Sequence, residues 1–461
     1  MAARENPGYQ AARNIANALR VAGHQAYLAG GCVRDLLLGL EPKDYDVATS
    51  ATPGTVLQLF ADRKTVTVGA HFGVVLVCDP NGIATEVATF RHDGAYSDGR
   101  RPDAVRYSTD PKEDVLRRDF TINGMLLDPT IYDQTGNASA ATLDYVGGRE
   151  DLAAHILRAI GDPALRFAED KLRMLRAVRF AARLGFAIDP ATAAAIRQLA
   201  SQITVVSPER IRDELTLILT EGGARPGFEL LDQLNLLPYI LPEITKLHGV
   251  QQPPEYHPEG DVWVHTLLLL EKLPAGASST LGWGALLHDV GKPATYRAPD
   301  PSNPNDRIRF NGHVEIGVRI AEVILARLRF SNEEIAQIVA LVKNHMRFGD
   351  VLHMRESTLK RFLRLPRFDE HLALHRMDCL SSHGDLRLYE FAKEQYEATP
   401  IEAIQPTPLI TGRDLIAAGY APGPRFKKML EAAEDAQLEG TVTTQTEALH
   451  FVQERFGTPA K

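Results

Sequence analysis

Twenty residues at 28–47, "LAGGCVRDLLLGLEPKDYDV", constrain this chain more than any other stretch of its sequence. A glycine pair and an arginine precede two carboxylates, Asp44 and Asp46, that are separated by one residue. The run "DYDVAT" has the composition of a short β-strand, and residues two apart in a strand project from the same face. The pattern therefore predicts that the two carboxylates lie together on one face of the strand. Such a pair forms a good binding site for hard divalent cations such as Mg²⁺.

The residues before the two aspartates suit a phosphate group. Gly30 and Gly31 let backbone N–H groups approach a triphosphate without a Cβ in the way, and Arg34 would neutralise its charge. Because Mg²⁺ is usually bound through one or two carboxylates together with substrate phosphates, the pattern indicates phosphoryl or nucleotidyl transfer. Each element alone is commonplace, but the order Gly-Gly-x-Val-Arg-Asp followed by Asp-x-Asp is specific.

That order resembles the head-domain motif of the superfamily of class II tRNA nucleotidyltransferases and bacterial poly(A) polymerases. The stretch "RRDFTING", which begins at Arg117, resembles a second motif of this superfamily, one that holds the ribose and the triphosphate. The resemblance implies charge from Arg117 and Arg118, and hydrogen bonds to sugar hydroxyls from Asp119 and Asn123. Glycine stands at 124 where the superfamily usually has alanine, and this departure is expected to loosen the packing.

A third stretch, "RFAEDKLRMLRAVRF" at 166–180, resembles the base-selecting helix of the superfamily. Asp170 and Arg173 are three residues apart and are expected to be neighbours on one helix face. A carboxylate that accepts from an exocyclic amino group, beside a guanidinium that donates to an unprotonated ring nitrogen, accepts cytosine and adenine. The same pair rejects guanine and uracil, because a mismatched base leaves a buried polar group unpaired. Further residues of this stretch assigned to the nucleotide are Glu169, Arg176 and Arg179.

Two features of the predicted head leave alternatives open. Glu86, in "GIATEVATFR", is either a third carboxylate beside the aspartates or a solvent-facing glutamate on an edge strand. The polar, glycine-rich segment 91–105 corresponds to a mobile loop that family members need for switching from C to A addition.

Histidines and aspartates recur between 257 and 380, each in or beside a separate predicted helix. Helices that face one another can converge such side chains on a metal. Their order, His…His-Asp…His…His…Asp, resembles the HD-domain phosphohydrolases. Neutral imidazoles with carboxylates favour Mn, Fe, Ni or Zn over Mg²⁺, and a metal-bound water would attack a phosphomonoester or a 2′,3′-cyclic phosphate. The resemblance implies a one-metal core of His265, His288, Asp289 and Asp378, and a second ion held by His313 and His345.

The pattern along the chain predicts an α+β fold. A small mixed-sheet nucleotidyltransferase head is followed by an all-helical neck and body, an HD helical domain and a helical tail. Short β-rich runs end near 150, and long segments rich in Ala, Leu and Arg are typical of helices. A proline-rich stretch at 243–260 indicates a boundary. The expected divisions are an N-terminal helix at 1–25, the head at 26–150, the neck and body at 151–245, the HD domain at 250–390 and the tail at 391–461.

Composition indicates the cellular compartment of the protein and limits the partners that it can bind. Three cysteines that are far apart suit a reducing compartment, and no uncharged run has the length of a membrane span. We therefore expect a soluble cytoplasmic protein with no membrane partner. The net charge of −8 argues against nucleic acid, but basic residues crowd into 158–183, where few acidic partners accompany them.

Together these patterns predict a Mg²⁺-dependent enzyme that adds CCA to tRNA from CTP and ATP by two-metal catalysis. An appended HD phosphohydrolase and no obligate protein partner are expected. An A-adding tRNA nucleotidyltransferase and a poly(A) polymerase are the alternatives within the superfamily. From other classes, the alternatives are an HD hydrolase with an RNA-binding head and a structural RNA-binding module. Intact Asp44 and Asp46 argue against the first of these, and two complete metal constellations argue against the second.

Overall fold

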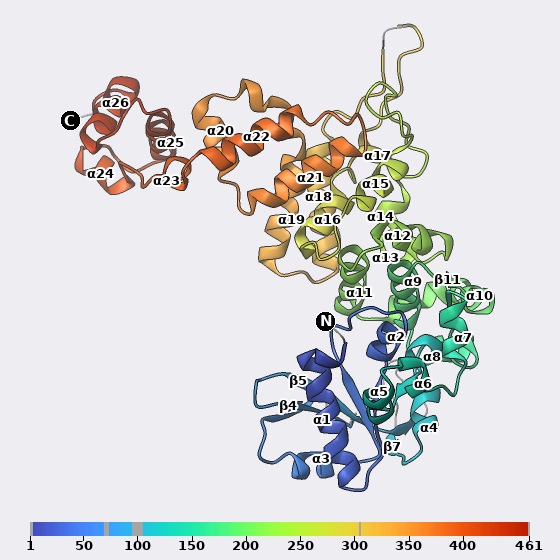
Figure 1. Cartoon of the computed structure of the whole chain (residues 1–461). Helices are drawn as coiled ribbons and strands as arrows, with labels where there is room; N and C mark the ends of the chain where they lie inside the picture. The colour runs from blue at the N-terminus through green and yellow to red at the C-terminus, as the bar shows by residue number, and fades with distance from the viewer. Residues whose placement is uncertain (1–2, 69–72, 95–104, 304–305, 460–461) are drawn as a thin grey trace. The chain divides into compact units, whose positions relative to one another are not determined.

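The computed structural model of the protein describes residues 3–68, 73–94, 105–303 and 306–459 (Figure 1). The chain forms two compact units, Met1–Pro242 and Glu243–Lys461. The first unit combines a mixed sheet with helices, and the second is built of helices. The expected α+β class is confirmed.

The first unit is built on a seven-stranded sheet with the order β3-β4-β5-β2-β1-β8-β9. Strand β2 runs parallel to β5 and antiparallel to β1, so it lies in the interior of the sheet. The strands of this sheet are β1 Ala26–Ala29, β2 Asp46–Thr49, β3 Thr65–Val68, β4 Val74–Cys78, β5 Ala84–Thr89, β8 Leu126–Leu127 and β9 Thr142–Leu143. Two further pairs are β6 Arg91–Asp93 with β7 Val105–Tyr107, and β10 Ile156–Leu157 with β11 Ala187–Ile188.

Helix α1, Pro7–Val21, buries one face, which includes Tyr9 and Leu19. Its start is fixed by Asn6, whose side-chain oxygen accepts the backbone N–H groups of Gly8 and Tyr9 at 2.8 and 3.3 Å. The remaining helices of this part are η1 Ala3–Glu5, α2 Gly31–Leu37, α3 Pro53–Leu59, α4 Pro111–Leu116, η2 Thr121–Asn123, α5 Pro129–Thr135, α6 Ala138–Ala141 and α7 Gly148–Ala153.

From Pro163 onward the first unit is mainly helical. Helix α9, Arg173–Leu184, is largely buried and ends at Gly185, whose φ of 67° is a left-handed conformation that suits glycine. The other helices are α8 Pro163–Glu169, α10 Pro190–Leu199, η3 Ala200–Val205, α11 Pro208–Thr220, α12 Ala224–Gln233, α13 Leu237–Ile240 and, at the boundary, α14 Pro242–Thr245.

The single helix expected over 166–180 is wrong, because α8 ends at Glu169 and α9 begins at Arg173. Asp170 lies between the two helices with an extended backbone, at φ −144° and ψ 109°. Its Oδ1 accepts the backbone N–H of Leu172 at 3.0 Å. The aspartate side chain thus satisfies a backbone N–H of the short turn between α8 and α9. Asp170 and Arg173 are therefore not neighbours on one helix face.

The expectation that Gly124 loosens the packing is also wrong. A Cβ built on Gly124 would lie 2.9 Å from Cδ1 of Ile160 and 3.0 Å from Cγ2 of Val146. The two branched side chains already fill the space in which an alanine methyl group would stand. The glycine is thus matched by larger neighbours, as volume-conserving packing requires.

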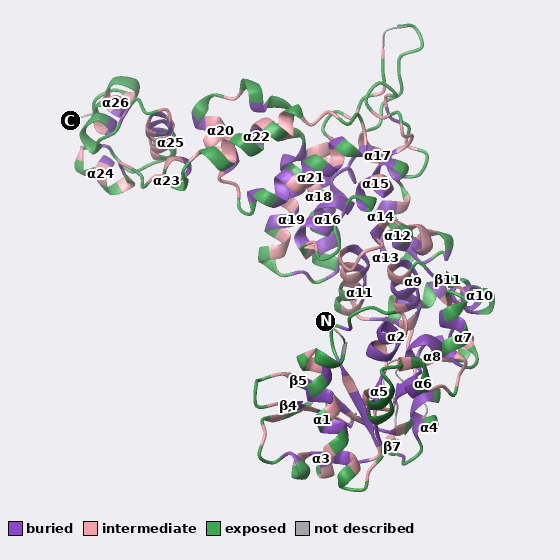
Figure 2. Ribbon diagram, in the orientation of Figure 1, coloured by how far each residue is buried: buried purple, intermediate pink, exposed green. Residues whose placement is uncertain are grey.

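The second unit buries apolar side chains where α16, α18, α19 and α21 meet (Figure 2). Its last three helices enclose a core of their own that includes Leu415, Met429 and Val452. The helices are α15 Val262–Glu271, α16 Ser279–Leu287, α17 Lys292–Thr295, α18 His313–Arg327, α19 Asn332–Asn344, η4 His345–His353, α20 Glu356–Leu363, α21 Phe368–Leu380, α22 Arg387–Ala398, α23 Ile401–Ile404, α24 Gly412–Ala417, α25 Arg425–Leu438 and α26 Gln445–Phe456.

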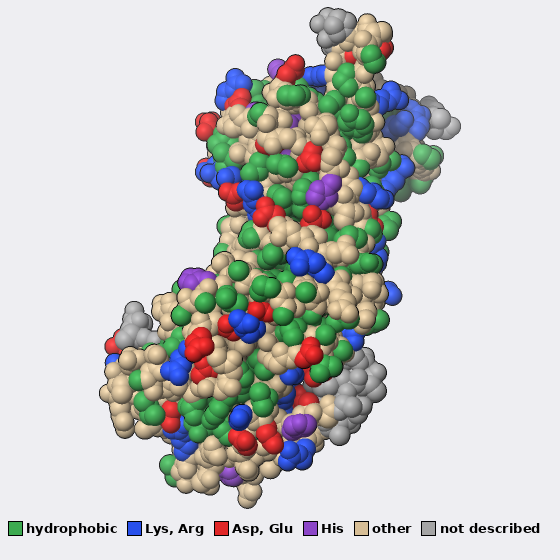
Figure 3. Space-filling view, turned by 90° about the vertical axis from the view of Figure 1, so that its right-hand side faces the viewer, with side chains coloured by type: hydrophobic (Ala, Val, Ile, Leu, Met, Phe, Trp, Pro, Cys, Tyr) green, Lys and Arg blue, Asp and Glu red, His purple; other side chains and the backbone are tan. Residues whose placement is uncertain are grey.

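Among the residues that the structure describes, no helix combines the length and the apolar character that crossing a membrane requires. Charged side chains of both signs are interspersed over the face shown in Figure 3. The whole chain has 51 Lys and Arg against 59 Asp and Glu. A concentration of positive charge for an anionic ligand is found instead in a cavity of the first unit.

Candidate functional site

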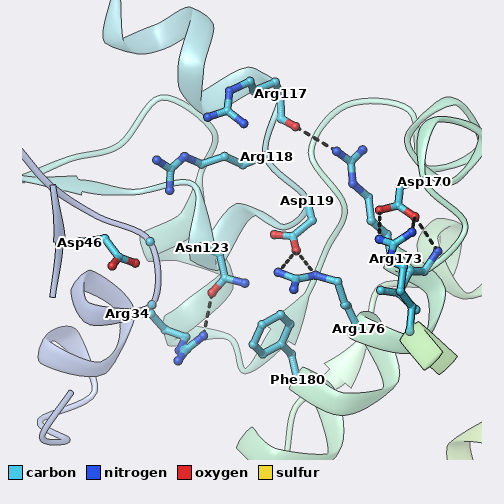
Figure 4. Close-up of a pocket in the computed structure, with 14 residues that line it drawn as sticks. Arg34, Asp46, Arg117, Arg118, Asp119, Asn123, Asp170, Arg173, Arg176 and Phe180 are labelled. Atoms are coloured by element: carbon cyan, nitrogen blue, oxygen red, sulfur yellow. Dashed lines mark hydrogen bonds and ion pairs between the residues drawn. The ribbon is translucent and has the colours of Figure 1, made fainter. Parts of the chain in front are cut away.

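The first unit contains a cavity of about 500 Å³ in which arginine predominates (Figure 4). Six arginines and three aspartates line it, so its charge is positive although the chain as a whole is acidic. Such a surplus of guanidinium groups suits a polyanion such as a nucleoside triphosphate. The lining residues are Gly30, Gly31, Arg34, Asp46, Arg117, Arg118, Asp119, Asn123, Asp170, Leu172, Arg173, Arg176, Phe180 and Arg210.

Arg34 is held in the cavity wall by α2 and by two polar partners. Its Nη1 donates to Oδ1 of Asn123 at 2.7 Å, and its Nε donates to Oδ1 of Asp35 at 2.8 Å. Gly30, which precedes α2, has a φ of 79°, a conformation that side chains disfavour. A Cβ on Gly30 would also lie 3.3 Å from Nη1 of Arg118. The glycine therefore allows the backbone turn and a guanidinium to lie close together.

Arg117 and Arg118 share one carboxylate that lies behind the cavity wall. Asp114 in α4 is fully buried, and its Oδ1 accepts from Arg117 at 2.6 Å while its Oδ2 accepts from Arg118 at 3.0 Å. Burial by itself raises the pKa of Asp114, but the two guanidinium groups outweigh it and hold the pKa below its usual value. The ionised Asp114 carboxylate thus aligns two guanidinium groups, and the three groups together keep a net positive charge.

Asp119 and Arg176 form an ion pair inside the cavity. Oδ2 of Asp119 accepts from Nε of Arg176 at 2.9 Å, and Oδ1 accepts the backbone N–H of Phe120 at 2.8 Å. Burial favours a raised pKa for Asp119, but the Arg176 charge outweighs it and lowers the pKa. The Phe180 ring supports Arg34 and Arg176, whose guanidinium carbons each lie 5.4 Å from its centroid.

Asp46 and Glu86 lie side by side on neighbouring strands. Val47 pairs with Val87 in the parallel ladder of β2 and β5. The residues that precede them, Asp46 and Glu86, therefore project from the same face of the sheet. Burial first, and the Glu86 charge second, raises the pKa of Asp46 to about 6. Strand β5 is interior to the sheet, so Glu86 is not on an edge strand. Its side chain is exposed and does not line the cavity, but its charge acts on Asp46.

Asp44 differs from the expectation for a strand residue. Strand β2 begins at Asp46, so Asp44 precedes it, is exposed and does not line the cavity. Its charge nevertheless contributes to the raised pKa of Asp46. The two carboxylates are close, but the alternation of a strand does not place them.

The far end of the cavity carries two ion pairs that involve the predicted base-reading residues. Asp170 accepts from Nη2 of Arg210 in α11 at 2.7 Å. Arg173 donates to Oε2 of Glu169 at 2.5 Å and to the backbone oxygen of Arg117 at 3.3 Å. A carboxylate and a guanidinium therefore face the cavity from separate elements, each supported by another charged group.

Most residues predicted to bind the nucleotide line this cavity. Glu169 lies behind the wall against Arg173, and Arg179 is buried in ion pairs with Glu214 and Glu221. Sequence reasoning missed Phe180, which it treated as the end of a motif, and Arg210, which is distant in the chain. The segment 91–105, predicted to act in switching, lies mostly outside the described residues.

In the second unit, all six predicted metal ligands converge. Nε2 of His265 lies 3.3 Å from Nε2 of His288 and 3.1 Å from Oδ1 of Asp378. Nε2 of His313 lies 3.4 Å from Nε2 of His345. His265, His288 and Asp378 form one group, and Asp289, His313 and His345 form another. Asp289 also lies close to His288 and His265, so it remains beside the other residues of the predicted one-metal core.

Asp289 lies between the two groups. Its Oδ2 is 3.2 Å from Nε2 of His288, and its Oδ1 is 3.8 Å from Nε2 of His345 and 3.9 Å from Nε2 of His313. Lys292 also contacts Oδ2 at 2.6 Å. The arrangement would let Asp289 bridge two cations.

Hydrogen bonds at Nδ1 orient the four imidazoles of the cluster. Nδ1 of His288, His313 and His345 faces a backbone carbonyl oxygen at 2.7–2.9 Å, and a carbonyl can only accept, so Nδ1 carries the proton. Nδ1 of His265 faces the carboxylate of Glu259 at 2.8 Å. With the proton on Nδ1, the Nε2 lone pair points into the cluster. Metal-binding histidines commonly have this arrangement, in which the nitrogen that does not bind the metal donates a hydrogen bond.

A second cavity of about 590 Å³ adjoins this cluster and is lined by Asp289, His313, His345 and Asp378. Three basic residues, Lys292, Arg307 and Arg309, line the same cavity. It could therefore hold an anionic ligand next to the carboxylates and imidazoles.

Three family models match parts of the chain. They are the Poly A polymerase head domain over residues 26–158, the Probable RNA and SrmB-binding site of polymerase A over 185–247, and tRNA nucleotidyltransferase domain 2 over 313–452.

Full-length relatives are similar over almost the whole chain. The CCA-adding enzyme of Lacticaseibacillus paracasei is 31% identical over 458 residues, covering 96% of this chain and 95% of the relative. The A-adding tRNA nucleotidyltransferase of Deinococcus radiodurans is 32% identical over 446 residues, covering 93% and 95%. The crystal structure of the Bacillus stearothermophilus CCA-adding enzyme in complex with CTP aligns over 98% of both chains, with a TM-score of 0.72 and 27% identity.

The Asp114 contacts predict that Asp114→Asn destabilises the protein at neutral pH by about 2 kcal/mol, because two guanidinium groups lose their shared charge. The pKa of Asp114 is lowered by folding, so its stabilisation is present above the unfolded pKa of about 3.9 and is lost as the pH falls through the lower folded value. Denaturant melts from pH 7 to pH 3 should show the difference between the two proteins shrinking in acid. A difference that is constant with pH would contradict an ionised Asp114.

Proposed function

Because the chain belongs to the tRNA nucleotidyltransferase family of the CCA-adding enzymes, we propose that it completes CCA at the 3′ end of tRNA from CTP and ATP. The observation that carries this proposal is the surplus of arginine charge in the first cavity. Asp46 lies at one end of that cavity, and Asp170 and Arg173 lie at the other (Figure 4). CTP or ATP bound in this cavity would have its phosphates beside Asp46 and its base beside Asp170 and Arg173.

The carboxylates at one end suit magnesium. Asp44, Asp46 and Glu86 offer only oxygen donors. The pKa of Asp46 is raised first by burial and then by the charge of Glu86, and a bound cation would favour the ionised form. Two magnesium ions held there would lower the pKa of the tRNA 3′-hydroxyl and neutralise the leaving pyrophosphate.

The arginines at the same end bind and orient the triphosphate. Arg34, Arg117 and Arg118 come from two separate segments and are fixed by Asn123 and Asp114, so little reorganisation accompanies binding. In the transfer, the 3′-oxygen forms a bond to the α-phosphorus while the bond from that phosphorus to the β-phosphate breaks. The pre-aligned guanidinium groups stabilise the charge that develops on the phosphate oxygens.

Base selection follows from the groups at the other end. Cytosine and adenine each present an exocyclic amino group beside an unprotonated ring nitrogen, which the Asp170 carboxylate and the Arg173 guanidinium match. Guanine and uracil reverse the donor and acceptor, so each unpaired group costs about 1–3 kcal/mol. The Asp170–Arg210 ion pair restrains the carboxylate before a base arrives. Protein side chains thereby replace a nucleic-acid template.

The tRNA itself is expected to be recognised through its shape and backbone, because base edges of an A-form helix are hard to reach. A-only addition is the main alternative, since the A-adding relative is as similar to this chain as the CCA-adding one. A poly(A) polymerase is a weaker alternative, because "TVTVGAHFGVVLV" lacks a basic run after the catalytic strand.

A second activity, metal-dependent phosphoester hydrolysis, is favoured by the cluster in the second unit. Four Nε2 atoms and two aspartates face one another there, and the backbone carbonyls at Nδ1 of His288, His313 and His345 leave the Nε2 lone pairs of these three rings toward the centre. Nitrogen and oxygen donors in this mixture favour Mn, Fe, Ni or Zn. A metal bound there would supply an activated water, and the adjoining Lys292, Arg307 and Arg309 would hold a substrate phosphate.

The first proposal predicts that the protein completes CCA on three tRNA transcripts: one that lacks CCA, one that ends in its first C and one that ends in CC. Each is incubated with Mg²⁺ and CTP, ATP or both, and products are resolved at single-nucleotide length. Asp46→Asn should lower incorporation by about 10³-fold or more, since a catalytic carboxylate is lost, whereas Asp62→Asn, at an exposed position of the same unit, should not. A added only to the CC transcript would identify an A-adding enzyme, and a long A ladder would identify a poly(A) polymerase.

The second proposal predicts that the purified chain retains Mn, Fe, Ni or Zn, measured by mass spectrometry, and hydrolyses p-nitrophenyl phosphate. Asp289→Asn should lose both properties and keep Mg²⁺-dependent nucleotide incorporation. His371→Gln is a matched control, because His371 is a buried histidine of α21 outside the cluster. Equal metal content in wild type and Asp289→Asn, or loss of incorporation as well, would contradict a separate second centre.

A further inference from the structure

The N-terminal segment Arg4–Arg13 lies outside the residues that the head-domain model matches, which begin at 26. It nevertheless contacts the chain immediately around the paired aspartates. Asn6 donates from Nδ2 to Oε1 of Glu41 at 2.8 Å, and Glu41 belongs to the loop that leads into Asp44.

Asp44 and Asp46 differ in what fixes them. Asp46 is the first residue of β2 and pairs with Ala29 in the antiparallel ladder with β1. Asp44 precedes the strand and is exposed, so the sheet ladder does not hold it. Its neighbour Tyr45 is only 4% exposed and is the buried residue next to it in the chain.

Ring contacts hold Tyr45 in place. Its hydroxyl has no hydrogen-bond partner among the described residues, so hydrogen bonding does not orient the side chain. The ring meets that of Tyr9 edge-on, with centroids 5.7 Å apart and an interplanar angle of 73°. A Cβ on Gly8 would lie 3.2 Å from Cδ2 of Tyr45, so the first turn of α1 packs directly against the tyrosine.

Tyr9 is itself firmly anchored on its other side. It is fully buried, and its ring meets that of Tyr132 in α5 edge-on at 5.6 Å. Its hydroxyl donates to Oδ1 of Asp133 at 2.7 Å, and Nη1 of Arg4 donates to the backbone oxygen of Asp133 at 2.9 Å. The row Tyr132–Tyr9–Tyr45 therefore runs from α5 through α1 to the peptide between the two aspartates.

We propose that the N-terminal segment Arg4–Arg13 is part of the nucleotidyl-transfer centre, with Tyr9 as the positioning residue that sets Asp44 through Tyr45. This inference rests on the proposed role of Asp44 and Asp46 as magnesium ligands. Removing the Tyr9 ring frees Tyr45 and displaces Asp44 more than Asp46, because β2 retains the latter. Cation binding and the transfer step then weaken, whereas nucleotide binding changes little, because Arg34, Arg117 and Arg118 lie on other elements.

The test compares Tyr9→Leu, Tyr9→Phe and Leu19→Ala in the full chain. Leu19 is fully buried in the same helix and serves as the control for a loss of packing that is remote from Tyr45. One readout is Mn²⁺ affinity without tRNA, measured by electron paramagnetic resonance with every variant made in the Asp289→Asn background, which removes the proposed second centre, and with Asp44→Ala as the reference for a lost ligand. The others are kcat, KM for CTP and the Mg²⁺ concentration that gives half-maximal rate.

We expect Tyr9→Leu to weaken Mn²⁺ binding and raise the half-maximal Mg²⁺ concentration by about 10-fold, as is typical when the support of a metal ligand is lost. It should lower kcat while KM for CTP stays within about twofold of wild type. Tyr9→Phe, which keeps the ring contacts, should bind Mn²⁺ within about twofold of wild type. Leu19→Ala should melt earlier without a change in cation affinity.

Mn²⁺ affinity in Tyr9→Leu equal to that of wild type, or equally reduced in Leu19→Ala, would overturn the inference. If Asp44→Ala binds Mn²⁺ as wild type does, Asp44 is not a ligand, and the inference is overturned together with that part of the proposed function. If the wild-type chain adds no nucleotide, the proposed transfer activity fails, and the Mn²⁺ measurements still decide whether Tyr9 positions Asp44.

Discussion

Guanidinium groups crowded into one cavity are the constraint on which the first unit depends. Without a ligand they repel one another, and each is held by a carboxylate that also fixes its direction. The pairs draw on α2, α4, α8, α9 and α11 and on the segments between them, so the cavity is organised before any anion arrives. The pairs are Arg34 with Asp35, Arg117 and Arg118 with Asp114, Arg173 with Glu169, Arg176 with Asp119 and Arg210 with Asp170.

Sequence patterns predicted the α+β class, most residues of the first cavity and the convergence of six metal-ligand candidates. They failed where a side chain overrides a periodic pattern. Asp170 accepts a backbone hydrogen bond in a turn that interrupts the expected helix, and the spacing of apolar residues carries no sign of this. Asp44 fell outside its expected strand because the ladder with β1 begins only at Asp46. Arg210 joins the cavity from a distant helix, and no local motif could reveal that contact.

The two candidate centres differ in donor chemistry. Asp44, Asp46 and Glu86 provide carboxylate oxygens, which suit a hard ion that keeps water and phosphate ligands. The second unit combines imidazole nitrogens with Asp289 and Asp378, and backbone carbonyls fix three of its four imidazoles in one tautomer. The two sets of donors would therefore suit different classes of metal ion.

Direct binding of the four nucleoside triphosphates tests most directly whether protein side chains select the base. Calorimetric titration of the chain with CTP, ATP, GTP and UTP in Mg²⁺, without tRNA, would compare their affinities. CTP and ATP should bind at least about 10-fold more tightly than GTP and UTP, because one mismatched polar group costs about 1.4 kcal/mol or more. Equal affinity for all four would contradict base selection by Asp170 and Arg173.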